Sequence, residues 1–217
     1  MKTKLALAGL AVAAATAFGA PAIAQTADNG FQAGSILVRG RLIDVIPQNS
    51  TSSVSLIGGH VDATTSIVPE VDFSYFFTDN IAVELIAATS RHSLSATGTA
   101  LGKVPVGTTW VLPPALTVQW HFLPKGPINP YVGAGLNYTF FYNTHPAGGA
   151  VTKLGLNNNI GEVLQIGVDF GLGGRWYGNV DVKQIFLDTK AKVNGGAIVA
   201  KTALNPTVVG LGVGYRF

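Results

Sequence analysis

The sequence contains no cysteine, and only 12% of its 217 residues are charged. Without cysteine, neither disulfide bonds nor thiolate chemistry is possible. Beyond the amino-terminal segment, the chain also lacks an apolar run of the roughly 20 residues that a transmembrane helix needs. Hydrophobic residues nevertheless make up 47% of the chain, and the mean hydropathy is +0.36. The apolar residues must therefore lie in elements shorter than a membrane-spanning helix.

The excess of basic over acidic residues nearly disappears when the amino-terminal segment is left out. Residues 1–24 contain the three parts of a secretory signal peptide in order, namely two lysines, a short apolar run and an Ala-Ile-Ala cleavage motif. We predict cleavage after this segment, which leaves residues 25–217 as one domain. Cleavage removes two of the 14 basic residues and none of the 11 acidic ones, so the net charge falls from +3 to +1. No Lys/Arg run remains that would indicate a nucleic-acid partner.

The chain contains stretches in which apolar residues alternate with small, polar or charged ones, most clearly in residues 207–217. One face of this stretch is apolar and ends in Tyr215 and Phe217, whereas the other holds Val208, three glycines and Arg216. A period of two is the pattern of a β-strand whose two sides meet different environments. The free carboxylate after Phe217 needs water, so the terminal aromatics would lie at a membrane–water boundary, where aromatic rings are favoured. The stretch therefore predicts a strand with lipid on one side and a barrel lumen on the other.

Seven further segments alternate in the same way. Together with the last one they give eight predicted strands, at residues 31–46, 67–77, 81–89, 110–122, 130–142, 160–170, 176–187 and 207–217. Short turns at 78–80, 123–129 and 171–175 alternate with polar loops at 47–66, 90–109, 143–159 and 188–206. An even strand number, with short turns on one side and long loops on the other, is typical of outer-membrane barrels. The predicted fold class is all-β: residues 25–217 form an eight-stranded antiparallel transmembrane β-barrel in the outer membrane of a Gram-negative cell, with periplasmic termini.

Charged residues of both signs fall on the inward faces of these strands. This lumen charged belt comprises Arg39, Arg41, Glu70, Asp72, Glu84, Asp169, Asp181, Lys183 and Arg216. An eight-stranded barrel is narrow enough for side chains nearly to fill it. Charges in such a lumen are expected to pair, because unpaired buried charges are costly. We therefore interpret each of them as part of a structural salt bridge in preference to a substrate contact.

Several stretches carry a resemblance to a known family. They are VPEVD at 68–72, YFF at 75–77, NIAVEL at 80–85, LPPALTVQWHF at 112–122, PYVGAGLNY at 130–138 and GVGYRF at 212–217. Together they resemble the outer-membrane protein W (OmpW) family, which includes AlkL-type proteins, over essentially the whole mature chain. The resemblance implies an apolar channel for passive uptake of small hydrophobic molecules, with lateral release into the bilayer. It also implies that Tyr215 and Phe217 belong to a signal read by the barrel-assembly machinery.

The sequence offers residues for such a channel. Candidate funnel residues lie near the loop-side ends of their strands, above the charged belt: Trp110, Val111, Leu112, Phe141 and Leu187. Pro69 in the second predicted strand and Pro113 and Pro114 in the fourth flank the third strand, and proline cannot donate to a β-ladder. These prolines are candidates for a lateral exit beside residues 85–89. The alternative is a pair of β-bulges that only shape the barrel.

Signals of catalysis are weak, and no enzyme is expected. The chain has no G-x-S-x-G motif or metal-ligand spacing, and its four histidines fall in or beside different loops and turns. A lipid-modifying barrel enzyme would need a Ser/His pair, and none can be identified from the sequence. We therefore assign no catalytic, metal-binding or cofactor-binding residue and expect no cofactor.

The expected partners are membrane lipid and lipopolysaccharide, small hydrophobic solutes and the barrel-assembly machinery, with the protein itself a monomer. Two other functions are compatible with a barrel. The chain could be a structural or adhesive envelope protein that acts through its surface loops, or a soluble lipocalin-like binder. The terminal Phe217, the outward aromatic residues and the low charge argue against the soluble binder.

Overall fold

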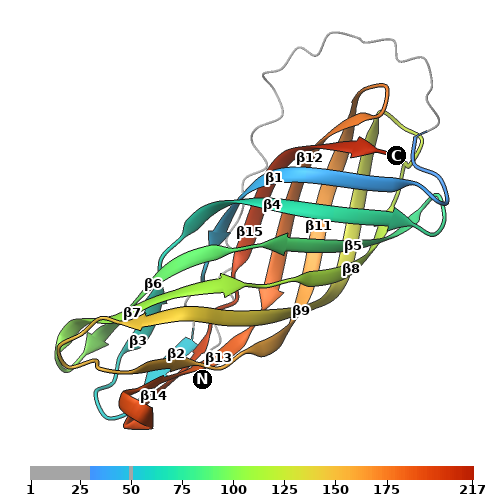
Figure 1. Ribbon diagram of the computed structural model, residues 1–217. Coiled ribbons are helices and arrows are strands. Elements are labelled where there is room, and N and C mark those ends of the chain that lie inside the picture. The colour runs from blue at the N-terminus through green and yellow to red at the C-terminus, as the bar shows by residue number, and fades with distance from the viewer. Residues whose placement is uncertain (1–29, 49–50) are drawn as a thin grey trace.

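The computed structural model describes residues 30–48 and 51–217, so the predicted signal peptide at residues 1–24 lies outside the described residues. Eight antiparallel strands form a wall: β1 (Ile36–Ile46), β4 (Ser66–Phe76), β5 (Ile81–Ala88), β8 (Ala115–His121), β9 (Ile128–Pro146), β11 (Asn159–Gly173), β12 (Trp176–Phe186) and β15 (Thr207–Arg216). Their order is β11, β12, β15, β1, β4, β5, β8, β9, and β9 closes the ring by pairing with β11 (Figure 1). The predicted eight-stranded antiparallel barrel is confirmed.

The two ends of the barrel differ. Short turns connect β4 to β5, β8 to β9 and β11 to β12, and the carboxy terminus lies at the same end, which we call the turn end (Figure 1). The opposite end carries the long connections, and we call it the loop end. Within the described residues, no helix combines the length and the hydropathy needed to cross a bilayer.

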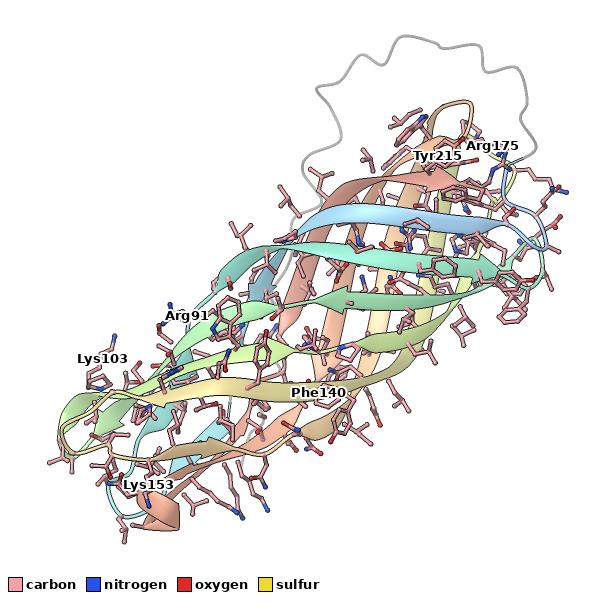
Figure 2. All side chains as sticks on the ribbon, viewed as in Figure 1. Arg91, Lys103, Phe140, Lys153, Arg175 and Tyr215 are labelled. Atoms are coloured by element: carbon pink, nitrogen blue, oxygen red, sulfur yellow. The ribbon has the colours of Figure 1, made fainter. Side chains whose placement is uncertain are left out.

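Alternation along each strand determines which side chains face outward. In β8, Leu116 and Trp120 are 55% and 48% exposed, whereas the intervening Thr117 and Gln119 face the lumen and are 1% exposed. Large apolar side chains such as Phe140 are exposed on every strand of the wall (Figure 2). An apolar outer band around a polar interior is the arrangement of a barrel surrounded by lipid. The exposed charged side chains labelled in Figure 2 lie towards the ends: Arg91, Lys103 and Lys153 near the loop end, and Arg175 near the turn end.

The four segments predicted as polar loops connect the barrel strands at the loop end, and they contain regular secondary structure that the sequence did not indicate. They contain β2 (Thr51–Val54), β3 (His60–Ala63), β6 (Ser90–Thr99), β7 (Gly102–Leu112), β10 (Leu154–Leu156), β13 (Asp188–Val193), the short helix η1 (Asn194–Gly196) and β14 (Ile198–Ala203). β2 pairs with β14, β3 with β6, β10 with β13, and β7 with the long barrel strand β9. These segments are rich in Ser, Thr, Ala and Gly, and their strand character comes from partners distant in the sequence more than from local pattern.

The first strand begins later than predicted, because the chain before β1 turns into the lumen. Phe31 is 0% exposed, and its ring stacks on Phe76 and Tyr177 with centroids 4.6 and 4.5 Å apart. The Phe31 backbone N–H donates to the carbonyl oxygen of Pro124 at 2.8 Å. Gly30 has a φ of 52°, and a Cβ at this position would overlap the same carbonyl. Phe31, Phe76 and Tyr177 thus form an aromatic plug at the turn end.

The interior is layered along the barrel axis, and β1 passes through the layers in order. Its inward residues are Leu37 beside the aromatic plug, then two arginines of the charged belt, then Ile43 in an apolar cluster. That cluster comprises Ile43, Ile86, Ala115, Val163, Ile185, Leu187 and Val208. Smaller apolar clusters pack between the loop-end hairpins, around Leu94 and around Val61. The lumen therefore changes from charged to apolar towards the loop end.

Candidate functional site

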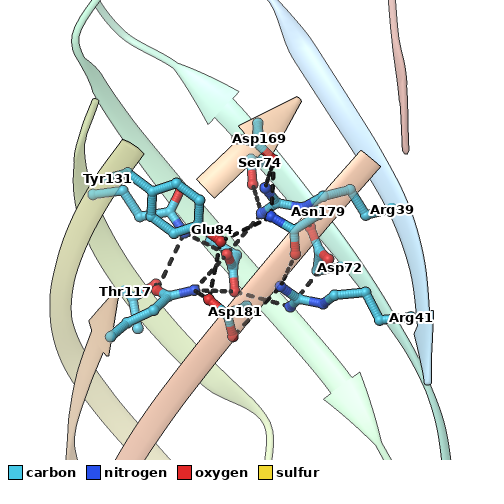
Figure 3. Close-up of polar contacts among 12 residues, drawn as sticks. Arg39, Arg41, Asp72, Ser74, Glu84, Thr117, Tyr131, Asp169, Asn179 and Asp181 are labelled. Carbon is cyan, nitrogen blue, oxygen red and sulfur yellow. Dashed lines mark hydrogen bonds and ion pairs between the residues drawn. The ribbon is translucent and has the colours of Figure 1, made fainter. Parts of the chain in front are cut away.

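The charged belt is organised around Arg39, whose side chain is fully buried. Its Nε donates to Asp72 Oδ1 at 2.8 Å, and Nη2 donates to Glu84 Oε2 at 2.8 Å (Figure 3). Nη1 donates to Asp169 Oδ1 at 3.1 Å, and Nη2 also donates to Ser74 Oγ at 3.0 Å. The three carboxylates belong to β4, β5 and β11, so one guanidinium ties β1 to three other strands.

Arg41 and Lys183 are the other basic groups of this network. Arg41 Nη2 lies 2.5 Å from Glu70 Oε1 and 3.4 Å from Glu84 Oε1. The Lys183 ammonium donates to Asp181 and lies 3.5 Å from Glu84 Oε1. All of these side chains are at most 1% exposed. Each of these buried charges therefore lies within ion-pair distance of an opposite charge, as the cost of an unpaired buried charge requires.

Arg216 is the member of the predicted belt that lies at a different level. In the register between β1 and β15 it faces Leu37, whereas Arg39 faces Gly214. The prediction is corrected accordingly, because Arg216 belongs to the layer of the aromatic plug. The belt itself consists of three basic and five acidic side chains. Despite this acidic excess, the described residues include no group of three or more His, Cys, Asp or Glu side chains placed to hold a metal ion.

Neutral side chains that the sequence analysis did not single out complete the belt. Gln165 donates to Glu84 Oε2 at 3.0 Å and to Asp181 Oδ2 at 2.7 Å. The Tyr131 hydroxyl donates to the same Asp181 oxygen at 2.9 Å. The sequence feature that could have indicated the buried position of Tyr131 is Gly167. A Cβ at this glycine would overlap the tyrosine ring. An inward-facing glycine in a narrow lumen thus marks the close approach of a large neighbour.

An apolar cavity lies between the charged belt and the loop end. It encloses about 1030 Å³ of empty space, including the part that opens to solvent. Glu70 and Lys183 of the belt lie at its floor. Most other lining residues are apolar: Ile43, Val45, Pro47, Val61, Ala63, Val68, Ile86, Ala88, Leu94, Val111, Pro113, Phe141, Leu156, Ile185, Leu187, Ala191, Leu204, Pro206 and Val208.

The cavity brings together part of the predicted funnel. Three of the five candidates line it: Val111, Phe141 and Leu187. Trp110 and Leu112 lie on the opposite face of β7 from Val111, and Trp110 stacks on Tyr142 with centroids 6.2 Å apart. The assignment of Trp110 and Leu112 to the funnel is therefore corrected, because these two positions lie on the face of β7 that points away from the cavity.

Polar side chains interrupt the apolar lining on β6, in the loop-end hairpin. Ser90 Oγ lies 2.8 Å from His92 Nε2, and His92 Nδ1 lies 2.5 Å from the backbone oxygen of Thr64. Ser90 and His92 are 3% and 5% exposed, and both line the cavity. Burial lowers the pKa of His92, so its ring is neutral at neutral pH. This Ser/His pair was missed in the sequence, although residues two apart on a strand share a face.

The predicted strand at residues 81–89 corresponds to β5, which continues into β6. The β-ladder on the edge of this strand that faces β4 is interrupted. Pairing between β4 and β5 runs as far as Glu70 opposite Ala88. On this edge the Thr64 N–H donates to the Ser93 carbonyl oxygen at 3.1 Å, and paired positions resume between β3 and β6 at Ala63 opposite Leu94, with the register offset by one residue. Pro69 occupies the first position beyond the last β4–β5 pair. Since proline has no N–H, it cannot extend that ladder.

The ladder on the opposite edge of β5 and β6, which faces β8 and β7, is interrupted as well. Pairing between β5 and β8 ends at Ile86 opposite Ala115 and resumes between β6 and β7 at Ser90, in the same register. Pro113 and Pro114 lie opposite the unpaired positions, yet β9 keeps one register on both sides of them. The pairing thus shows missing partners at these two prolines and no bulge. Residues 87–89 thus lack ladder partners on the edge that faces β8, while Ala87 and Ala88 remain paired with β4. We call residues 87–89 and the three facing prolines the ladder gap.

Comparisons with known proteins agree with this architecture. A sequence model described as the OmpW family matches residues 32–217. The chain is 40% identical to the uncharacterized outer-membrane protein y4mB of Sinorhizobium fredii, over 94% of this chain and 90% of that protein. It is 33% identical to outer membrane protein W of Vibrio cholerae, over 99% of this chain and 100% of that protein. The crystal structure of the outer membrane protein OprG from Pseudomonas aeruginosa is similar with a TM-score of 0.79 at 27% identity, over 87% of this chain and 98% of that one.

Proposed function

The chain belongs to the OmpW family of outer-membrane proteins, and from this premise we propose that it is a channel for passive uptake of small hydrophobic molecules. An apolar solute enters the cavity from the loop end and leaves sideways through the ladder gap into the bilayer. The turn end, where the described residues begin at Gly30 and end at Phe217, then faces the periplasm. One structural observation carries the proposal. The apolar cavity is closed towards the turn end by the charged belt, and it borders the part of the barrel wall where the β-ladder is interrupted.

The floor argues against straight passage along the barrel axis. Arg39, Glu84 and Lys183 are buried and joined to their neighbours by ion pairs, and the aromatic plug fills the lumen beneath them. Opening a path through the belt would leave buried charges without partners, which costs about 3–5 kcal/mol for a broken pair. A solute that reaches the floor therefore has no low-energy route to the turn end.

The lining of the cavity favours apolar solutes. Transfer of apolar surface out of water is favourable by about 25 cal/mol per Å². A polar solute in the same space would lose its hydrogen bonds to water, at a cost of about 1–3 kcal/mol for each group left unpaired. The acidic excess of the belt below the cavity further disfavours anionic solutes.

The ladder gap supports the sideways exit because no ladder has to be broken between residues 87–89 and the segment that contains Pro113 and Pro114. Ala88 and Pro113 lie at the gap and also line the cavity, so the two features are continuous. On the outer surface near the gap, Leu85 and Phe140 are 51% and 41% exposed. A released apolar solute would therefore meet an apolar outer wall and the acyl chains that surround it.

Family membership places the barrel among membrane lipid and lipopolysaccharide. We further propose that it acts as a monomer and that the barrel-assembly machinery reads Tyr215 and Phe217. These two rings pack edge to face with centroids 5.0 Å apart at the turn end, and Tyr215 makes a similar contact with Trp176. Such a cluster is compatible with an aromatic girdle at a membrane boundary.

Uptake by cells with and without this gene tests the proposed function. We expect the protein to accelerate uptake of a labelled small aromatic solute and to leave a polar solute of similar size unaffected. Equal acceleration of both solutes would indicate an aqueous pore instead. No effect on either solute would favour a structural or adhesive function carried by the surface loops.

A further inference from the structure

Ser90 and His92 form a hydrogen-bond chain whose direction follows from the chemistry of its last member. A carbonyl oxygen only accepts, so His92 Nδ1 carries the proton that it donates to Thr64 at 2.5 Å. Nε2 of the neutral ring is then an acceptor, and Ser90 donates its hydroxyl proton to it at 2.8 Å. The Ser90 oxygen keeps free lone pairs but has no proton left to offer. The chain therefore presents a hydrogen-bond acceptor at the cavity wall.

This acceptor is stronger than an isolated hydroxyl. A hydroxyl that donates a hydrogen bond is polarised, and its oxygen becomes a better acceptor, more so in surroundings of low polarity. Ser90 and His92 are at least 95% buried, and most of the residues around them in the cavity are apolar. Away from Glu70 at the floor, the acceptors in the lining are hydroxyl groups, and among them Ser90 is the one polarised by a histidine.

The position of Ser90 links it to the path of the solute. Ser90 is opposite Val111, the first paired position beyond residues 87–89 on the edge that faces β8 and β7. Ala88, on the same inward face, precedes it and also lines the cavity. A solute that moves from the cavity to the ladder gap therefore passes this hydroxyl.

We propose that Ser90, oriented by His92, is a hydrogen-bonding subsite for the hydroxyl or N–H group of an otherwise apolar solute. The proposal rests on the proposed function and narrows the substrate class to small apolar molecules with one donor group, such as phenols and medium-chain alcohols. Pure hydrocarbons use the apolar walls alone. His92 is a positioning residue that holds the Ser90 proton away from the solute.

Equilibrium binding to the purified full-length barrel in lipid nanodiscs tests the subsite with two matched probes. 4-Ethylphenol and 4-ethyltoluene have nearly the same size and differ in a hydroxyl against a methyl group. In Ser90→Ala, affinity for 4-ethylphenol is expected to fall about three- to tenfold relative to that for 4-ethyltoluene, the effect of one hydrogen bond. Ser93→Ala is the matched control, because Ser93 is exposed on the other face of the same strand, and its affinity ratio should stay unchanged.

A second variant tests the direction of the chain. His92→Phe retains a ring but removes the acceptor Nε2, so the Ser90 proton becomes available to the solute. Affinity for 4-ethylanisole, which accepts but cannot donate, is then expected to rise relative to 4-ethylphenol. A purely structural contact between Ser90 and His92 would not change this ratio.

Two results would overturn the subsite while leaving the channel intact. One is an unchanged phenol-to-toluene affinity ratio in Ser90→Ala. The other is a ratio that responds only to Thr202→Val, because the Thr202 hydroxyl is also buried in the cavity wall, without a hydrogen-bond partner. Failure of the unmodified barrel to bind either probe would contradict the proposed function as well, so the two failures are distinguishable.

Discussion

Replacing Arg39 by methionine is expected to lower the free energy of unfolding by about 3–5 kcal/mol, the usual cost of removing one partner of a buried ion pair. The guanidinium is fully buried and bound to three carboxylates on three strands, none of which can turn towards water. Methionine fills much of the same volume, so the loss of charge dominates the effect. Glu84 keeps its contacts with Lys183 and Gln165, whereas Asp72 and Asp169 lose their main partner.

Urea unfolding of the barrel in lipid vesicles, followed by tryptophan fluorescence, measures this loss. Arg175→Met is the matched control, because Arg175 is exposed at the turn end and its replacement should change the free energy by no more than about 0.5 kcal/mol. A second replacement, Asp72→Asn, should restore part of the stability of the Arg39 variant, since it removes one unpaired charge. Equal stability of the Arg39 and Arg175 variants would contradict the interpretation of the belt as a structural network.

Filling the cavity is expected to have the largest effect on function. Ala88→Trp places a large ring at the point where the cavity meets the ladder gap. Uptake of an apolar solute should fall to the rate of cells that lack the protein, because the path is occupied. Stability should change little or fall by about 1–3 kcal/mol, the range for overpacking a partly open site.

The neighbouring position supplies the control for this prediction. Ala87 is on the same strand but exposed on the outer face, so Ala87→Trp adds the same bulk on the outer surface and should leave uptake intact. Initial uptake rates of both variants, at matched amounts of folded barrel in the outer membrane, decide the outcome. Normal uptake by Ala88→Trp would show that solutes do not use this cavity.

The barrel itself could be predicted from the sequence because alternation is a local property. Leu116 and Trp120 against Thr117 and Gln119 already indicate which face meets lipid, and the structure follows that division. The same alternation places Trp110 on the outward face, because Trp110 and Leu116 are an even number of residues apart. The position of Trp110 in the pattern, and not its apolar character, determines which way its side chain points.

Other features could not be predicted because they depend on contacts between distant strands. Nothing local to β2 or β14 indicates that they pair with each other across about 150 residues of chain. The hydrogen bond from His92 to Thr64 joins two loops in the same way. The belt was predicted as a set of charges, but the network of Arg39 with its three carboxylates depends on which strands face each other across the lumen.

The central claim is that apolar solutes leave sideways through the ladder gap, and a covalent link across that gap tests it most directly. The chain has no cysteine, so two pairs of thiols can be introduced on the outer face, one on each edge of the gap. Ile67→Cys with Arg91→Cys links the edge that faces β4, and Thr89→Cys with Leu112→Cys links the edge that faces β8; both pairs are present in the tested variant. Leu42→Cys with Leu211→Cys is the control, since these exposed residues pair across the intact ladder of β1 and β15. Uptake of an apolar solute is measured before and after treatment with a thiol crosslinker. We predict that linking the gap reduces uptake to that of cells without the protein and that the control link has no effect. Full uptake with the gap linked would contradict lateral release.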